Sequence, residues 1–237
     1  MFTKSAKFYD ALYRWKDYAR ETQRLRSVVE RLRRSAGLRL LDVACGTGGH
    51  IAHLKAHYSV EGLDLDPEMV AVARARHPEV VFHVAEMGTF DLGRRFDVVV
   101  CLFSSIGYAA SLEAMRGAVA NMARHLEPGG VLAVEPWLTP ANVRPGGLHA
   151  LFVDDPDLKI ARINVSTVAE GRTVFDFHYL VGAREGVEHF TEHHEMGLFT
   201  HDQYMEAFEG CGLETTCDAE GLMGRGLYLG RREGGGS

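Results

Sequence analysis

Leu40-Leu41-Asp42-Val43-Ala44-Cys45-Gly46-Thr47-Gly48-Gly49-His50 is the stretch that decides the fold. Residues 40–44 are apolar apart from one acid, which predicts a buried strand. A glycine-rich bend follows at 46–49, and residues 50–54 then begin a helical pattern. This succession is typical of the ligand-binding turn of a doubly wound α/β sheet, where glycines let a ligand approach the backbone closely.

The spacing of the glycines separates this bend from two other nucleotide-binding loops. No Lys-Ser/Thr pair follows the last glycine, so the bend is not a P-loop, and no third glycine stands in the register of the dinucleotide fingerprint. The bend instead resembles the first motif of class I S-adenosylmethionine-dependent methyltransferases, in which an acid precedes a short Gly-x-Gly turn. That resemblance implies a Rossmann-like α/β sheet with S-adenosylmethionine as the cofactor.

Length and composition limit the possible function classes. The 237 residues suit one large α/β domain or one domain with an insertion. The formal net charge of −6 provides no general basic field for a nucleic-acid backbone, and no apolar run approaches the roughly 20 residues that span a bilayer. No apolar core follows residues 1–7, so we expect no secretory signal, and four scattered cysteines without a CxxC predict reduced thiols. We therefore expect a cytoplasmic protein with no nucleic-acid or membrane partner.

The alternation of patterns along the chain predicts the architecture. Residues 5–34 have helical spacing, and the aromatic stretch 8–13 indicates either core packing, which the spacing favours, or a lid over the ligand. An antiparallel meander is predicted within 147–196, because alternating strands are joined there by turns that contain glycine. The other predicted strands are 38–44, 59–64, 80–84, 95–103, 131–137, 213–218 and 226–231, and the other predicted helices are 49–57, 67–76, 111–126 and 200–208.

Acids at strand ends are the candidate cofactor ligands. Asp64 ends the second strand, 18 residues after Gly46, where an acid can accept hydrogen bonds from both ribose hydroxyls. Asp66 is expected to cap the helix that starts at Pro67, although two acids this close can exchange these roles. By resemblance to class I methyltransferases, Glu86 accepts from the adenine amine while Met87 packs on the base.

Motifs along nearly the whole chain resemble one enzyme family. These motifs are Lys16-Asp17-Tyr18, Leu41–Gly48, Phe103–Tyr108, Leu126–Gly130, Val134–Trp137, Leu198-Phe199-Thr200 and Gly224–Leu227. The chain resembles the N-methyltransferases that dimethylate the amino group of nucleotide-linked deoxyaminosugars, such as those making desosamine and mycaminose in macrolide antibiotics. The resemblance implies a nucleotide-diphosphate aminosugar as substrate and a homodimer formed through the meander.

The resemblance also divides the chain and assigns site residues. The expected parts are an N-terminal helical cover (1–36), a cofactor-binding core (37–137), an inserted antiparallel sheet for substrate and dimerisation (138–197), a C-terminal helix and strands (198–233) and a flexible tail (234–237). The expected catalytic residues are Tyr108, Ser105 and Tyr9; the cofactor residues are Tyr18, Asp42, Ala44, Gly46, Gly48, Asp64, Leu65, Glu86, Met87 and Phe103; and the substrate residues are Tyr13, Trp137, His178, His193 and Arg225.

The expected chemistry places modest demands on the protein. In-line methyl transfer to a neutral amine needs alignment and exclusion of water more than a strong base. Tyr108 then either orients the amine through its hydroxyl or simply packs on the substrate, and the sequence leaves these two roles open. Arg225 suits a diphosphate because a guanidinium binds such oxygens in pairs, and the alternative is a surface arginine in a turn.

The remaining histidines predict no metal site. His50, His53 and His57 have helical spacing without an acid or cysteine in register, which indicates a partly exposed helix face. His193 and His194 are adjacent in a strand and point to opposite faces, so they cannot share one ion.

Three alternative functions remain to be weighed. A nucleic-acid amino methyltransferase is disfavoured, because residues 103–106 lack the Asn/Asp-Pro-Pro-aromatic motif and no basic stripe is evident. A methyltransferase acting on a hydroxyl or amine of another natural product would use the same cofactor half, and for a hydroxyl it would need a base for the proton. A non-catalytic S-adenosylmethionine-binding protein would leave Tyr108, Trp137 and Arg225 without a purpose.

Overall fold

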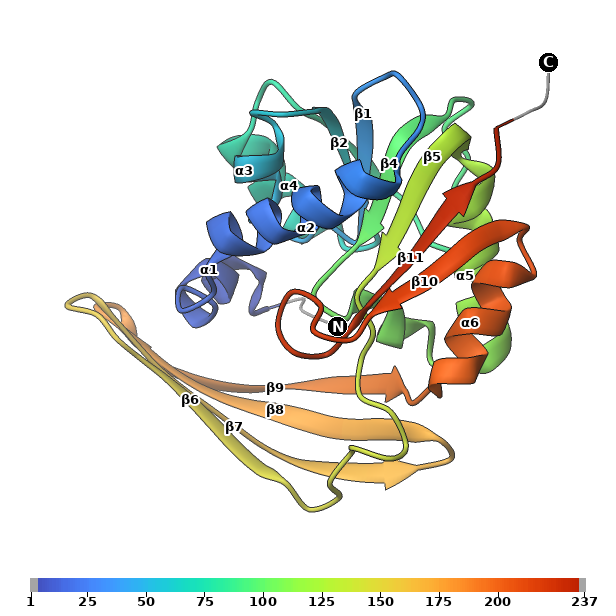
Figure 1. The fold of residues 1–237 in the computed structure, drawn as a ribbon. Helices are drawn as coiled ribbons and strands as arrows, with labels where there is room; N and C mark the ends of the chain where they lie inside the picture. Colours follow the sequence, from blue (N-terminus) through green and yellow to red (C-terminus); the bar gives the residue numbers. More distant parts are fainter. Residues whose placement is uncertain (1–3, 235–237) are drawn as a thin grey trace.

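The computed structural model describes residues 4–234 and contains a seven-stranded and a four-stranded sheet (Figure 1). The order in the larger sheet is β10-β11-β5-β4-β1-β2-β3, and only the pairs β10–β11 and β11–β5 are antiparallel. Strand β1 (Arg39–Val43) is flanked by β2 and β4, so the chain winds outward from it in both directions. Ligands of such sheets bind at this switch point, which is where the glycine bend leaves β1.

The predicted α/β fold class, with its inserted meander, is confirmed. The larger sheet and its helices comprise α2 (Tyr18–Leu32), β1, α3 (Ile51–Leu54), β2 (Ser59–Asp64), α4 (Pro67–Arg76), β3 (Val81–Val84), β4 (Phe96–Cys101), η2 (Ser105–Ala109), α5 (Leu112–Arg124), β5 (Leu126–Val134), α6 (His201–Glu209), β10 (Leu213–Asp218) and β11 (Leu227–Arg232). The other elements are η1 (Ala6–Phe8), α1 (Tyr9–Leu12) and the strands β6 (Leu148–Asp154), β7 (Leu158–Ala169), β8 (Arg172–Ala183) and β9 (Gly186–Gly197).

Several predicted boundaries were wrong: the helix expected over 49–57 is confined to Ile51–Leu54, and the strand expected over 95–103 to Phe96–Cys101. Two further differences have identifiable reasons. The helix expected over 5–34 is interrupted after Leu12, and α2 restarts where the Asp17 side chain accepts a hydrogen bond from the backbone N–H of Arg20. Strand β5 begins at Leu126, ahead of the glycines at 129–130, because Leu126 pairs with Phe96 of β4 across an irregular register. The tail expected at 234–237 lies, apart from Gly234, outside the described residues.

The helices cover both faces of the larger sheet. Helices α5 and α6 bury one face around Val99, Met122 and Phe208, whereas α2, α3 and α4 bury the other around Leu25 and Leu54. All six residues of β4 are buried, as expected for a central strand covered on both sides. Among the helices that the structure describes, none is long and apolar enough to cross a bilayer.

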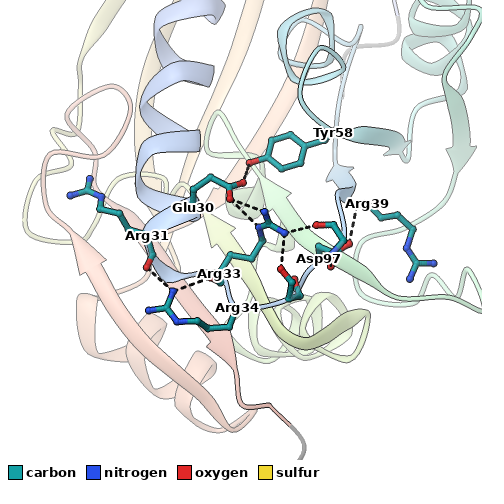
Figure 2. A network of polar contacts seen from close by, with 9 residues as sticks. Glu30, Arg31, Arg33, Arg34, Arg39, Tyr58 and Asp97 are labelled. Carbon is teal, nitrogen blue, oxygen red and sulfur yellow. Dashed lines mark hydrogen bonds and ion pairs between the residues drawn. The ribbon is translucent and has the colours of Figure 1, made fainter.

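A polar network fixes the end of α2 against the entry of the sheet (Figure 2). Glu30 accepts from Arg33 at 2.7 Å and from the Tyr58 hydroxyl at 2.6 Å. Asp97, in β4, accepts the backbone N–H groups of Gly37 and Arg39 at 3.0 and 2.9 Å. The bonds of Asp97 hold the start of β1, which is the end of the strand farthest from the glycine bend.

The four-stranded sheet has two unlike faces. Its inner face packs on the N-terminal segment: Leu12 and Tyr13 lie in one cluster with Val153, Tyr179 and Phe190. Its outer face, which is turned away from the larger sheet in Figure 1, leaves large apolar side chains exposed. We call this the outer patch; it consists of Leu148, Phe152, Ile163, Val165, Leu180 and Val187, each 42–72% exposed.

Candidate active site

The glycine bend is held open by Asp64. Ala44, Gly46 and Gly48 all have positive φ (58°, 55° and 80°), which raises the cost of larger side chains there. One carboxylate oxygen of Asp64 accepts the N–H of Gly46 at 2.8 Å, and the other accepts the N–H of Asp66 at 2.9 Å. Burial raises the pKa of Asp64, and these backbone bonds oppose that shift. Asp66 caps α4 by accepting a hydrogen bond from the backbone N–H of Glu68, as predicted, and the ribose role of Asp64 stays a prediction.

A small cavity of about 30 Å³ lies between the bend and α2, and Asp42 lines it. Within residues 4–234, Oδ2 of Asp42 has no hydrogen-bond partner, although the side chain is only 2% exposed. Burial, together with the nearby Asp64, raises the pKa of Asp42 to about 8. S-adenosylmethionine carries an ammonium and a sulfonium, so an unpartnered buried carboxylate fits this cationic cofactor.

A second cavity of about 120 Å³ continues from the bend toward β3. Asp64 and Leu65 line it on one side, and Glu86 and Met87 line it on the other, as expected for the ribose and adenine of the cofactor. Glu86 accepts the backbone N–H of Gly88 at 2.9 Å, which fixes its carboxylate at the rim.

The largest of these cavities, about 590 Å³, lies between the two sheets. Tyr9 and Ser105 line all three cavities, and Tyr108 lines the two larger ones, so these residues mark the junction of the cavities. After the roles expected for them, we call the two smaller cavities the cofactor cavities and the largest the acceptor cavity. The charged side chains described in its wall are Arg144, Arg162 and Arg225, with no carboxylate among them. In a chain of net charge −6, this cationic wall favours an anionic acceptor.

A strained turn after β4 connects the cofactor side to the acceptor side. Phe103 and Ser104 both have positive φ, 51° and 63°. Buried Glu135 accepts the N–H of Phe103 at 2.7 Å, which holds the first of these residues in place. Ser104 is held by its own hydroxyl, which donates to the carbonyl of Pro136 at 2.7 Å. The strain is typical of functional sites, and it presents Ser105 and Tyr108 to the junction.

Arg225 is tied to this turn by its side chain. Its guanidinium donates to Ser104 Oγ at 2.8 Å and lies 5.0 Å from the centre of the Trp137 ring. Trp137 in turn donates to Thr173 of β8 at 3.2 Å. Arg225 therefore faces the acceptor cavity and is not the surface arginine of the alternative interpretation.

The N-terminal segment covers the junction. Asp10 accepts from Thr47 of the glycine bend and from Arg76 of α4, each at 2.7 Å. Tyr13 packs edge-on against Phe103, with ring centres 5.2 Å apart, and Tyr18 packs against His50 at the small cavity. The aromatic residues of this segment pack on the core, as the spacing favours, and some of them also line the cavities, whereas the role of a lid stays a prediction.

Some predicted residues do not reach the cavities. His178 and His193 lie on the outer face of the four-stranded sheet, because inward and outward residues alternate along β8 and β9; His193 there bonds Asp176. Gly48 packs against His77 and lines none of the cavities described above. The exposed helix face expected for His50 was wrong, because its ring is buried and bonds Glu21 at 2.8 Å.

Two residues that were not among the expected site residues contact side chains that line the cavities. Arg162 donates to the Tyr13 hydroxyl at 2.9 Å, and its guanidinium lies 4.3 Å from the centre of the Phe177 ring. Buried Lys16 bonds Glu21 and lies 4.2 Å from the Phe103 ring centre. The one sequence signal for Arg162 was its place in a predicted strand, where every second side chain points to the inner face of the sheet. Within residues 4–234, no group of three or more His, Cys, Asp or Glu side chains is arranged to hold a metal ion.

Asp64→Ala is expected to weaken S-adenosylmethionine binding by about 1–3 kcal/mol, because charged hydrogen bonds to the ribose are lost and the Gly46 anchor disappears. Titration calorimetry measures the affinity, with Glu68→Ala on the exposed start of α4 as a control. An unchanged dissociation constant would contradict the ribose assignment.

Comparison with known proteins adds independent findings. A family profile described as a methyltransferase domain matches residues 40–130. The chain is 42% identical over 229 residues to dTDP-3-amino-3,6-dideoxy-alpha-D-glucopyranose N,N-dimethyltransferase of Streptomyces fradiae, covering 95% of this chain and 89% of the relative. Its structure is similar to that of Streptomyces venezuelae DesVI (TM-score 0.90, 38% identity, 97% and 98% of the two chains). It is also similar to CalS10 with bound S-adenosylmethionine, an amino pentose methyltransferase from Micromonospora echinaspora (TM-score 0.85, 37% identity, 95% and 96%).

Proposed function

The chain belongs to the family of dTDP-aminosugar N,N-dimethyltransferases within the S-adenosylmethionine-dependent methyltransferases, and we propose that it methylates the amino group of a dTDP-linked aminodeoxysugar. Three curated relatives, 38–42% identical over nearly the whole chain, carry that activity in their names and differ in the sugar. By its likeness to the solved structure of CalS10, which is named as involved in calicheamicin biosynthesis, we assign the product to an antibiotic sugar.

The acceptor cavity is the observation that carries this proposal. It joins the cofactor cavities at Tyr9 and Ser105, and its charged wall consists of arginines. The diphosphate would pair with the guanidinium of Arg225, while the sugar extends toward Tyr108 at the junction of the cavities. A wall without carboxylates also offers no counter-ion to a protonated amine, which favours binding of the neutral, reactive form.

The cofactor, when bound, supplies an electrophilic methyl group on a sulfonium. The protein's part is alignment: Tyr9, Ser105 and Tyr108 border the acceptor nitrogen, and the N-terminal segment excludes water. A hydroxyl acceptor would need a group to take its proton. His194, the histidine behind Tyr108, has its pKa lowered to about 3 by burial, which makes it a poor base at neutral pH and favours an amine as acceptor.

Mass spectrometry of a reaction with S-adenosylmethionine tests this function. The purified protein is incubated with dTDP-3-amino-3,6-dideoxyglucose, and we expect products heavier by one and then two methyl groups. The matched 3-hydroxy sugar serves as the control and is expected to gain none. Tight cofactor binding without methylation of a dTDP-aminosugar would contradict the proposal.

We infer that the outer patch is the contact surface of a homodimer in the cytoplasm. Its six large apolar side chains lie on one face of one sheet, and exposed patches of this kind mark protein interfaces. The four cysteines are free thiols, which agrees with a reducing compartment.

Phe152→Lys is expected to shift the dimer to monomer, because it replaces one of the most exposed large apolar side chains of the outer patch with a charge. Light scattering after gel filtration measures the mass at several concentrations. Leu38→Lys, at an exposed apolar residue before β1, is the matched control and should remain dimeric. A dimeric Phe152→Lys variant would exclude the outer patch as the interface.

A further inference from the structure

Tyr108 is backed by a buried histidine of the second sheet. Its hydroxyl lies 2.9 Å from Nδ1 of His194, although the two residues are 86 positions apart in the chain. His194 is 1% exposed and points from β9 to the inner face, opposite to its neighbour His193. Tyr108 itself lines both the acceptor cavity and the second cofactor cavity. The pair therefore links the inserted sheet to the place where the amine meets the methyl group.

The orientation of the His194 ring is fixed by aromatic neighbours. It stacks on Phe175 with ring centres 5.5 Å apart and planes 9° from parallel, and it contacts Phe177 edge-on at 4.9 Å. A ring held in this way cannot turn its nitrogens freely. Nδ1 therefore stays directed at the Tyr108 hydroxyl.

The surroundings keep both members of the pair uncharged at neutral pH. Burial, with Arg162 contributing, lowers the pKa of His194 to about 3. Burial raises the pKa of Tyr108 well above its ordinary value, with Tyr13, Tyr179 and Glu192 adding to the shift and Arg162 opposing it. Glu192 accepts hydrogen bonds from Lys4 and Ser5 of the N-terminal segment. A neutral phenol facing a neutral imidazole can order its hydrogen bond in one preferred direction.

The preferred direction follows from the chemistry of the two groups. A phenol hydroxyl is a strong donor, and the unprotonated nitrogen of a neutral imidazole is a strong acceptor. The acceptor amine has one lone pair, and that lone pair must remain free to attack the methyl group. A hydroxyl that donated to the amine would occupy the lone pair, whereas a hydroxyl oxygen that accepts an amine N–H leaves it free.

We propose that His194 is a positioning residue that accepts the hydroxyl hydrogen of Tyr108, so that the tyrosine oxygen presents a lone pair to an N–H of the acceptor amine. The amine lone pair is thereby oriented toward the methyl group. This inference rests on the proposed function, because it needs an amine as the acceptor. Under this proposal, Tyr108 orients the amine and does not merely pack on the substrate.

Two substitutions of His194 separate hydrogen bonding from packing. His194→Phe keeps an aromatic ring against Phe175 and Phe177 but removes the acceptor, whereas His194→Asn loses the ring and keeps an amide oxygen near the position of Nδ1. We expect His194→Phe to lower kcat about tenfold through misorientation, with S-adenosylmethionine affinity within twofold of the parent. His194→Asn should recover most of that kcat. A purely structural role predicts the opposite order.

A double-mutant cycle with Tyr108→Phe tests the coupling. If His194 acts through the hydroxyl, Tyr108→Phe lowers kcat about tenfold and adding His194→Phe lowers it no further. Multiplied losses of about a hundredfold, or full activity of His194→Phe, would overturn the inference while the parent enzyme stays active. Failure of the parent to methylate any dTDP-aminosugar would instead overturn the proposed function, and this inference with it. Because Tyr108 lies in the cavity wall, its variant reports on the bond even if substitutions of His194 impair folding.

Discussion

Asp42→Asn is expected to make the cofactor-free protein more stable at pH 8 and at the same time to weaken its affinity for S-adenosylmethionine. The carboxylate is buried, lines the small cavity and has a partnerless oxygen within the described chain. Asparagine keeps nearly the same shape but cannot ionise. The variant therefore does not pay for desolvating a buried charge, but its side chain also does not attract the cationic S-adenosylmethionine.

The sign of the pH dependence follows from the raised pKa. Folding raises the pKa of the Asp42 carboxyl from 3.8 to about 8. The unfolded chain therefore loses this proton at a much lower pH than the folded protein does. The free energy of unfolding is therefore highest below pH 4, where Asp42 is protonated in both states, and it falls as the pH rises to about 8. The decrease is about 1.4 kcal/mol for each pH unit, so at pH 7 it amounts to about 4 kcal/mol at most.

Thermal melting between pH 4 and pH 8 measures this effect without cofactor. The variant and the parent should melt together at pH 4, and the variant should melt progressively higher above that pH. Calorimetry should show its cofactor affinity reduced by about 1.5–3 kcal/mol, the value of a hydrogen bond to a charged group. A melting difference that does not change with pH would contradict the ionisation argument.

Arg225→Ala is expected to lower kcat/KM for a dTDP-aminosugar by a factor equivalent to about 2–4 kcal/mol, because the diphosphate loses a half-buried guanidinium partner. The loss should appear mainly in KM, since Arg225 lies on the acceptor side and donates to Ser104 away from the glycine bend. Affinity for S-adenosylmethionine should stay nearly unchanged.

Arg225→Lys is the informative companion variant. It keeps the charge but loses the paired N–H geometry and the contact with the Trp137 ring, so it should recover only part of kcat/KM. Arg184→Ala, at an exposed arginine between β8 and β9, controls for the loss of positive charge alone. Equal losses for acceptors with and without a diphosphate would remove the assigned role of Arg225.

The parts of the fold that depend on local patterns were predictable from the sequence. Helix α4 and strand β2 have the predicted ends, because Asp66-Pro67 is a strong helix start and the apolar run of 59–64 ends in an acid. The glycine bend with its acid predicted the cofactor side of the site for the same reason. These signals need no knowledge of distant residues.

The contacts that complete the acceptor side were not predictable, because they join residues far apart in the chain. His194 meets Tyr108 across 86 positions, and Arg162 meets Tyr13 across 149. The sequence indicated that His193 and His194 face opposite ways but not which of them faces inward. That choice depends on how the meander docks on the N-terminal segment, and local spacing does not encode it.

The N-terminal segment has a consequence for the order of events during two successive methylations. Tyr9 lines all three cavities, and Asp10 joins the segment to both Thr47 and Arg76. Two methyl transfers consume two cofactor molecules, so the spent one must leave before the second enters. Because this one short segment borders both the cofactor cavities and the acceptor cavity, a movement that releases the spent cofactor would also uncover the half-finished sugar. We therefore expect a distributive reaction, in which the monomethylated sugar accumulates free in solution before the dimethylated product forms.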